Sequence, residues 1–240
     1  MRNTSRLDPA EGILMSATAY TDLHHQEIAL QRPTIDVSQL PESVVDPKAT
    51  AWWGNNLLLL IETAMFAILV ACYLYYRNVD FAQWPPPHTA NVIADVDPNP
   101  KLMGSTIELG VMLISLVPAI WVHLACMRHR RNERTVRVWI VVLLVLELIS
   151  AALRFHGFSE LHHRWNENAY GSVTWGILFL HLLHLFISAG ETALMAIYLF
   201  VKGFDDKHAR DIRISLIYWY WVVAIWVPLY ALVYWGPRFL

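Results

Sequence analysis

Hydrophobic residues along this chain are gathered into five long stretches that are separated by polar segments. An α-helix of about 20 apolar residues crosses the ~30 Å hydrocarbon core of a bilayer, so stretches of this length predict membrane-spanning helices. The pattern therefore predicts an all-α, polytopic membrane protein, built as a bundle of five transmembrane helices. The expected spans are Trp53 to Tyr76, Ser105 to Met127, Val136 to Leu153, Val173 to Val201 and Ile214 to Trp235.

The N-terminal part of the chain has a different composition. Residues 1–50 are polar, include four prolines and show no sustained period. Segments of this kind are largely irregular, because they lack the apolar surface that a packed core needs. The sequence thus predicts two regions, an irregular tail over residues 1–50 and a transmembrane domain over residues 51–240.

Composition supports membrane insertion and argues against one class of partner. Hydrophobic residues make up 56% of the chain and charged residues 16%, whereas soluble domains average about 25% charged residues. The net charge of −2 gives no reason to expect nucleic acid as a partner. Eleven Trp and ten Tyr fit aromatic belts at the two membrane surfaces. The candidate interface aromatics are Trp84, Trp219 and Trp226.

Lys and Arg residues near the ends of the spans predict how the chain is oriented. One side carries most of them, in the loops after the second and fourth spans: Arg128, Arg130, Arg131, Arg134, Arg137, Lys202, Lys207, Arg210 and Arg213. The other side carries Arg77, Lys101, Arg154, Arg164 and Arg238. Because the more basic loops remain in the cytoplasm, the N-terminus is expected in the cytoplasm and the C-terminus outside it.

Several acids and histidines lie within or at the edge of the predicted spans, where polar groups are rare and commonly functional. They are Glu62, Glu108, Glu147, Glu191, His123, His181 and His184. An ionised, unpaired carboxylate inside a membrane is strongly unfavourable. Glu62, near the middle of its span, is therefore expected to be paired, protonated or turned to the protein interior. A structural role and a functional role are equally open for it.

His181 and His184 are three residues apart and share one face of the fourth helix, with Glu191 on nearly the same face. Three interpretations fit this arrangement: a proton relay, a metal site shared by the two histidines, and hydrogen bonding between helices. The absence of an evident third ligand in the sequence favours hydrogen bonding. No catalytic residue and no metal or cofactor site is therefore assigned to this chain.

Five motifs in this order resemble subunit III of the haem-copper oxidases, the cytochrome c oxidase family, over residues 52–240. The motifs are Glu62 with Ala64-Met65-Phe66, Trp84-Pro85-Pro86 with Pro98-Asn99-Pro100, Asn168-Ala169-Tyr170-Gly171-Ser172, Leu180-His181-Leu182-Leu183-His184, and the aromatic run from Tyr218-Trp219-Tyr220-Trp221 to Tyr234-Trp235. Each motif is weak alone, whereas their shared order and spacing are specific.

The resemblance implies an accessory, non-redox subunit of a terminal oxidase in aerobic respiration, located in a bacterial inner membrane. The C-terminus, which the charge pattern places outside the cytoplasm, is then expected in the periplasm. Such a subunit holds no haem or copper, which belong to the catalytic subunit I, and it assembles with subunits I and II. It binds phospholipid in a cleft between its helices and supports proton uptake. By the same resemblance, Glu62 is a buried acid near the contact with the catalytic subunit, and His181 and His184 are structural polar residues.

The chain departs from the family pattern in three places. Its polar tail stands where the mitochondrial form has two further helices, as in five-span bacterial members. The family's second glutamate falls on Gly157, with Glu160 one turn away, and a His and an Asp of the last helix fall on Tyr220 and Val223. Three alternatives to an oxidase subunit are open: an accessory protein of a nitric oxide reductase, a stand-alone transporter or channel that uses the intramembrane acids, and a metalloprotein that binds its metal through the two histidines of the fourth span.

Overall fold

The computed structural model describes residues 50–79, 84–86, 99–127, 133–204 and 206–239. Within these ranges every regular element is a helix, which confirms the all-α prediction. Five helices are long and apolar enough to cross a membrane, as the hydrophobic pattern predicts. The predicted tail lies outside the described residues, apart from Thr50, so the division into tail and membrane domain stays a prediction. The loop arginines at 128, 130 and 131 also lie outside them.

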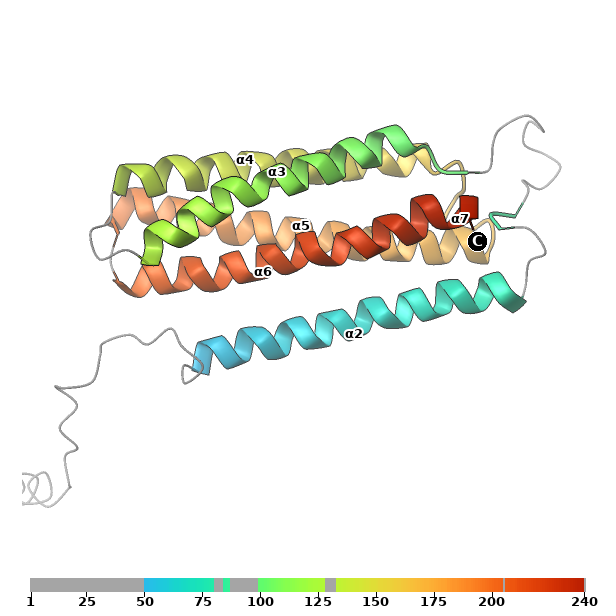
Figure 1. Cartoon of the computed structure of the whole chain (residues 1–240), viewed down its shortest axis with the longest axis horizontal. Helices are drawn as coiled ribbons and strands as arrows, with labels where there is room; N and C mark the ends of the chain where they lie inside the picture. Colours follow the sequence, from blue (N-terminus) through green and yellow to red (C-terminus); the bar gives the residue numbers. More distant parts are fainter. Residues whose placement is uncertain (1–49, 80–83, 87–98, 128–132, 205, 240) are drawn as a thin grey trace, which may run out of the picture. The chain divides into compact units, whose positions relative to one another are not determined.

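The helices follow the order of the predicted spans (Figure 1). The last span is made of three consecutive helical segments, of which the middle one is a π-helical turn. In chain order the elements are α2 (Thr50–Val79), α3 (Leu102–Met127), α4 (Glu133–Gly157), η1 (Phe158–Glu160), α5 (Ala169–Lys202), α6 (Asp206–Tyr230), η2 (Ala231–Trp235) and α7 (Gly236–Phe239).

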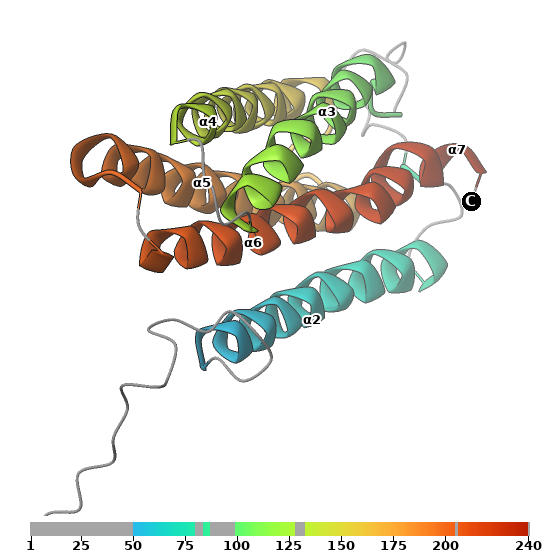
Figure 2. The ribbon, with the colours of Figure 1, turned by 60° about the vertical axis from the view of Figure 1, so that its left-hand side comes forward.

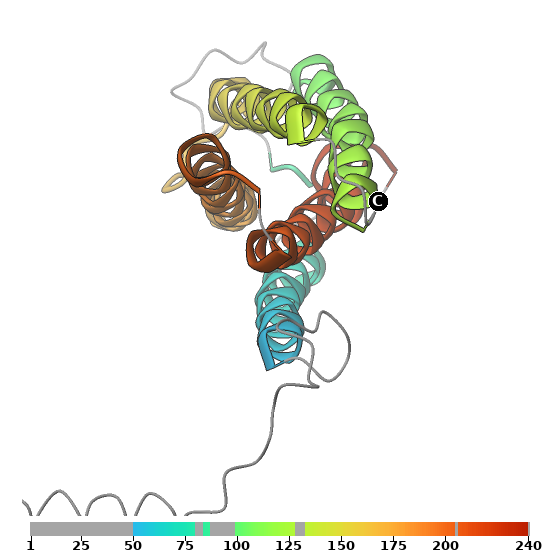
Figure 3. The same ribbon diagram turned by 90° about the vertical axis from the view of Figure 1, so that its left-hand side faces the viewer.

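Helices α3, α4, α5 and α6 pack around a common core, and α2 lies along the outside of α5 and α6 (Figure 2, Figure 3). The buried residues of α2 are Leu59, Phe66 and Tyr73, whose seven-residue spacing keeps one narrow face of the helix against the bundle. Much of the remaining α2 surface is apolar and exposed. This surface is suited to contact lipid or another membrane protein.

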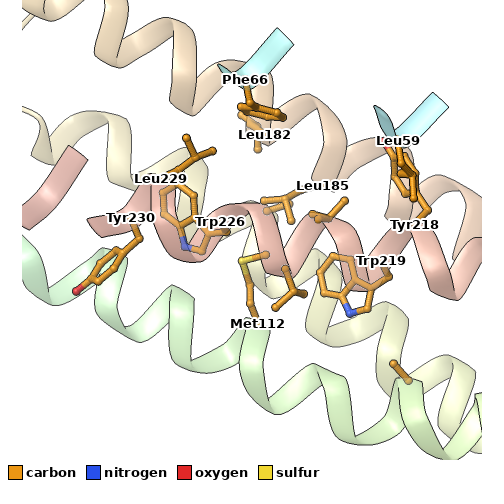
Figure 4. Packing of buried hydrophobic residues seen from close by; sticks show 14 of the residues in the cluster. Leu59, Phe66, Met112, Leu182, Leu185, Tyr218, Trp219, Trp226, Leu229 and Tyr230 are labelled. Carbon is orange, nitrogen blue, oxygen red and sulfur yellow. The ribbon is translucent and has the colours of Figure 1, made fainter. Parts of the chain in front are cut away.

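Large side chains from α3, α5 and α6 fill the core between the helices (Figure 4). Met112 of α3 and Leu185 of α5 are fully buried, and Trp219 and Trp226 of α6 are at most 1% exposed. A Trp side chain buries about 150–250 Å². The aromatic residues of the last span therefore supply much of the contact that holds α6 against α3 and α5.

Local sequence signals set both ends of α5. Asn168 is extended, and its side-chain oxygen accepts a hydrogen bond of 2.7 Å from the backbone N–H of Gly171, which caps the helix. A Cβ atom at Gly171 would overlap the carbonyl oxygen of Arg164, so only glycine fits at this position in the first turn of α5. At the other end, Gly203 has φ +85° and terminates the helix.

The helices extend beyond the predicted spans at their ends. The third span, expected over Val136 to Leu153, runs over Glu133–Gly157. Its first turn is polar and is supported by an ion pair of 2.6 Å between Arg137 and Glu133. Hydropathy marks only the apolar part of such a helix, because the polar ends continue into the interfacial region of the membrane.

Candidate functional site

The acid near the middle of the first span pairs with a histidine of the fourth span. Glu62 Oε2 lies 3.2 Å from His184 Nε2. The Glu62 side chain is 22% exposed and the His184 side chain 4% exposed. The rings of Phe66 and Trp221 pack against the imidazole, with centroid distances of 5.2 and 5.3 Å. The pair thus joins α2 to α5 at the edge of the core.

Hydrogen-bond chemistry restricts how this pair holds its proton. His184 Nδ1 lies 2.6 Å from the carbonyl oxygen of Leu180. A carbonyl oxygen only accepts, so Nδ1 carries a hydrogen. Nε2 of His184 then either accepts a hydrogen bond from a protonated Glu62 or donates one to an ionised Glu62. In both cases one proton lies between the two groups, and the pair has no net charge.

A second network joins all four core helices around Arg154 of α4. Its guanidinium donates twice to the Glu108 carboxylate, at 3.0 and 2.6 Å, and once to His181 Nδ1, at 3.1 Å. The Trp226 ring centroid lies 3.4 Å from the guanidinium carbon. All four residues are at most 1% exposed. The opposite charges compensate each other in a bidentate geometry, and the indole face adds a cation–π contact.

The same contacts fix the tautomer of His181. Arginine N–H groups only donate, so His181 Nδ1 accepts, and Nε2 must donate to the carbonyl oxygen of Val222, 3.1 Å away. Both ring nitrogens of His181 and both of His184 are therefore engaged. A metal bound between the two rings would have to break these hydrogen bonds. No group of three or more possible metal ligands occurs in the described ranges.

The other acids of the spans hydrogen-bond to hydroxyl groups. Glu147 is fully buried, and its Oε1 accepts from Ser188 and Thr192 of α5. Glu191 accepts a hydrogen bond of 3.0 Å from Ser215 of α6. Although Glu191 is expected on nearly the same face as His184, it bonds to α6 whereas His184 bonds to α2. The polar residues of the spans thus form separate hydrogen-bonded groups.

Two of the three candidate interface aromatics lie inside the bundle instead of at a membrane surface. Trp219 is 1% exposed and donates from Nε1 to Ser115 Oγ at 3.1 Å, and Trp226 is 0% exposed and covers Arg154. Polar partners within the core stabilise both indoles there, which explains the difference from the sequence expectation. Trp84 packs edge-on against Tyr73 of α2 and Tyr170 of α5.

Arg154 is the residue of these networks that the sequence does not single out. Sequence reasoning counts it only among the basic residues on the less basic side of the membrane. The signal for a buried role is its spacing, since Arg154 lies seven residues after Glu147 and follows Ser150 and Ala151 on the buried face of α4. An arginine in phase with buried positions predicts a buried partner of opposite charge.

Glu160 does not occupy the place of the glutamate that the family pattern puts at Gly157. A Cβ atom at Gly157 would face the hydroxyl group of Tyr234, 4.0 Å away. The carboxylate of Glu160 instead lies directly against Gly104, near the start of α3. The two positions have different neighbours, so an acid at 160 is not equivalent to an acid at 157. Tyr220 stands where the family pattern has a His in the last helix. Its hydroxyl oxygen lies 3.5 Å from His123 Nδ1.

Comparison with known proteins finds relatives across the transmembrane region. The family described as cytochrome c oxidase subunit III matches residues 49–237. "Cytochrome c oxidase subunit 3" of Drosophila melanogaster is 23% identical over 189 residues, covering 76% of this chain and 68% of the relative. Proteins of the same name match from Synechocystis sp., 24% identical over 188 residues (76% and 74% covered), and from Hippopotamus amphibius, 26% identical over 154 residues (63% and 55% covered).

The matched region contains the five membrane-spanning helices almost completely. It also contains the Glu62–His184 pair and the Arg154 network. The resemblance drawn from the five sequence motifs is thereby confirmed. The chain belongs to the cytochrome c oxidase subunit III family.

Proposed function

We propose that this chain is the accessory, non-redox subunit III of a haem-copper terminal oxidase in aerobic respiration. In this role it stabilises the catalytic subunit I and supports the uptake of protons by that subunit. The haem and copper belong to the partner subunits, and this chain carries no redox centre. The proposal rests on membership of the family and on the relatives named cytochrome c oxidase subunit 3.

The observation that best supports this function is the way α2 is held. One face of α2 is fixed by Glu62, which bonds to His184, and by Thr63, whose hydroxyl accepts a hydrogen bond of 2.8 Å from Trp221 Nε1. Other faces of α2 remain apolar and exposed. A helix fixed on one side and apolar on the others is suited to present a defined surface to the catalytic subunit.

A groove between α2 and α5 supports the binding of phospholipid in the same role. It has a volume of about 420 Å³ and is lined by apolar residues: Met65, Ile68, Leu69, Gly176, Phe179, Leu180 and Leu183. Gly176 lacks a side chain at the floor of this groove, where an added Cβ would touch only Leu69. We infer that an acyl chain occupies it, and phosphorus analysis of the purified complex would test whether phospholipid is retained.

The orientation in the membrane remains part of the proposal. Arg134, Arg137, Lys202, Arg210 and Arg213 belong to the described residues and lie near the ends of helices that meet on one side of the bundle. We propose that this side faces the cytoplasm of a bacterial cell, with the C-terminus in the periplasm. Reporter fusions that placed residue 134 outside the cytoplasm would contradict this orientation.

Substitution of Glu62 by alanine tests the proposed role. We expect less assembled oxidase and a shorter lifetime during turnover, because the change leaves Nε2 of the buried His184 without a partner. An unsatisfied buried polar group costs about 1–3 kcal/mol. Glu62→Gln retains a hydrogen-bonding side chain and should have a smaller effect. The measurements are the yield of purified complex and the oxygen consumption followed until it stops.

Glu133→Ala is the matched control for this experiment. Glu133 is also an acid on a membrane-spanning helix, but its ion pair with Arg137 is partly exposed, and such pairs contribute only about 0–1 kcal/mol. This variant should behave like the wild type. The proposal fails if the Glu62→Ala oxidase assembles, pumps protons and survives turnover as the wild type does.

A further inference from the structure

The two histidines of α5 differ in what their ring nitrogens face. His181 Nδ1 accepts a hydrogen bond from Arg154, so this imidazole is neutral. Both ring nitrogens of His184 instead face oxygen atoms, the carbonyl of Leu180 and the carboxyl group of Glu62. An imidazole between two acceptors can carry a hydrogen on each nitrogen, which makes it an imidazolium cation. Two histidines three residues apart can therefore differ in charge.

The hydrogen-bond lengths around His184 favour the cation. Its Nδ1 lies 2.6 Å from the Leu180 carbonyl oxygen, whereas neutral N–H donors most often lie about 2.9–3.0 Å from oxygen. Hydrogen bonds shorten when the donor is charged. Its Nε2 lies 3.2 Å from Glu62 Oε2, which is longer than the bonds of about 2.5–3.0 Å that O–H donors form with oxygen. Both lengths indicate that the shared proton belongs to the imidazole.

Three aromatic rings pack around this imidazole. The ring centroids of Phe66 and Trp221 lie 5.2 and 5.3 Å from that of His184. Tyr218 stacks on the imidazole at 6.3 Å, with an interplanar angle of 17°. Aromatic rings attract a cation within about 6 Å, Trp most strongly, and the attraction grows where water is excluded. Since the His184 side chain is only 4% exposed, the three rings favour its charged form.

The formal charges near His184 also favour a cation. A second acid, Glu191, lies within electrostatic range of Tyr218, whose ring stacks on His184. The positive charge of Arg154 is compensated by the two hydrogen bonds that it donates to Glu108. Charged side chains inside a membrane pair with an opposite charge or with backbone carbonyls. His184 has one partner of each kind.

Trp221 of α6 contacts both helices that carry the pair. Its ring packs on His184 of α5, and its Nε1 donates to Thr63 Oγ1 of α2 at 2.8 Å. The Thr63 hydroxyl donates in turn to the Leu59 carbonyl oxygen at 2.7 Å. An indole N–H only donates and a hydroxyl has one hydrogen, so the direction of both bonds is fixed. Because Thr63 follows Glu62, one indole sets the level of the carboxyl group beside the imidazole.

We propose that Glu62 and His184 form a carboxylate–imidazolium ion pair and that Trp221 is the residue that positions it. Separating two opposite charges in an apolar seam costs more than separating two neutral groups. The ion pair therefore holds α2 against α5 more firmly than a neutral hydrogen bond does. This inference rests on the proposed function for its role in the oxidase. Its readout is the charge of a side chain, not oxygen consumption, so either proposal can fail alone.

Solid-state nitrogen NMR of isotope-labelled histidine measures the charge of His184. The sample is the full-length chain, purified with the subunits that it retains. We expect two protonated ring nitrogens for His184, assigned by their loss in His184→Gln. Glu62→Gln should render His184 neutral, because no negative charge is left beside it. His181, assigned in the same way, is the internal control and should show one bare nitrogen. A bare ring nitrogen on wild-type His184 overturns the ion pair.

Trp221→Leu tests the positioning role with the same spectrum. Loss of the indole should shift the ratio of imidazolium to neutral His184 by about tenfold or more toward the neutral form. Trp121→Leu is the matched control, since Trp121 is 49% exposed on α3 and should leave the ratio unchanged. An unchanged ratio in Trp221→Leu overturns the role of Trp221.

Thr63 provides a second test if Trp221→Leu does not accumulate. Thr63→Val is close in shape and removes the acceptor for the indole N–H, so it should shift the ratio in the same direction by a smaller factor. Thr63→Ser retains the hydroxyl and should restore the wild-type spectrum. If Thr63→Val and Thr63→Ser both match the wild type, the indole does not position the pair through α2.

Discussion

Replacing Arg154 with methionine is expected to destabilise the chain by about 3–5 kcal/mol, because the Glu108 carboxylate would be left buried without its cation. Two hydrogen bonds to Glu108, one to His181 and the contact with Trp226 are lost together. Methionine retains an apolar stem of similar length, so the effect reports mainly on the charge and its hydrogen bonds. The measurement is thermal unfolding of the purified full-length chain, together with its yield from membranes.

A double-mutant cycle separates the ion pair from general damage to the core. Replacing Arg154 and Glu108 together by methionine should recover much of the loss, because apolar side chains of similar volume often replace a buried ion pair without cost. Arg137→Met serves as the control, since the Arg137–Glu133 pair is partly exposed and contributes only about 0–1 kcal/mol. Equal stability of Arg154→Met and Arg137→Met would show that the buried network contributes no more to the stability of the fold than the partly exposed ion pair does.

Truncating Trp219 to alanine is expected to cost about 3–5 kcal/mol, the range for loss of a large buried aromatic side chain. Trp219 is 1% exposed and its Nε1 donates to Ser115 Oγ, so the indole both fills the space between α3 and α6 and ties them together (Figure 4). Trp219→Phe retains much of the volume and loses the hydrogen bond. It should therefore have the smaller effect. The unfolding midpoint in detergent is again the readout.

Trp165→Ala provides the matched control for Trp219. Trp165 lies between α4 and α5 and is 63% exposed. Surface substitutions generally change stability by no more than about 0.5 kcal/mol. If Trp219→Ala and Trp165→Ala unfold at the same midpoint, Trp219 is not part of a packed core, and the arrangement of α6 against α3 is wrong.

The sequence predicts the number and order of the spans because length and hydropathy are sufficient for a transmembrane helix. It predicts their ends less well. The helix of the third span begins at Glu133, three residues before the predicted start, since Glu133 and Arg137 are polar but still favour a helical turn. The N-cap of α5 at Asn168 has a recognisable signal, an Asn three residues before Gly171, which the hydropathy pattern does not use.

The partners of the polar residues could not be predicted from the sequence. Arg154 and Glu108 are 46 residues apart, and Glu62 and His184 are 122 residues apart. Every helix presents apolar surface on several sides, so hydropathy does not determine which faces meet. In a membrane that choice depends on close packing and on specific hydrogen bonds. The sequence identifies polar candidates, and only the packed helices assign their partners.

His181 and His184 illustrate this limit. Their spacing correctly places them near one another on α5, about 60° apart around the helix axis, as follows from 3.6 residues per turn. That small angle is enough to turn His184 toward Glu62 of α2 and His181 toward Arg154 of α4 and Val222 of α6. Because α5 is covered by neighbours on several sides, two residues of one face acquire different partners and different hydrogen-bonding states.

The most direct test of the central claim is to purify the tagged full-length chain from its native membrane under mild conditions. The proteins that accompany it are then identified while an optical spectrum is recorded. An oxidase subunit III should bring down a larger multi-span subunit with haem and copper, and the preparation should consume oxygen. Co-purification with a haem protein that reduces nitric oxide and contains no copper would point to the other partner. A chain that is recovered alone and colourless would contradict the account.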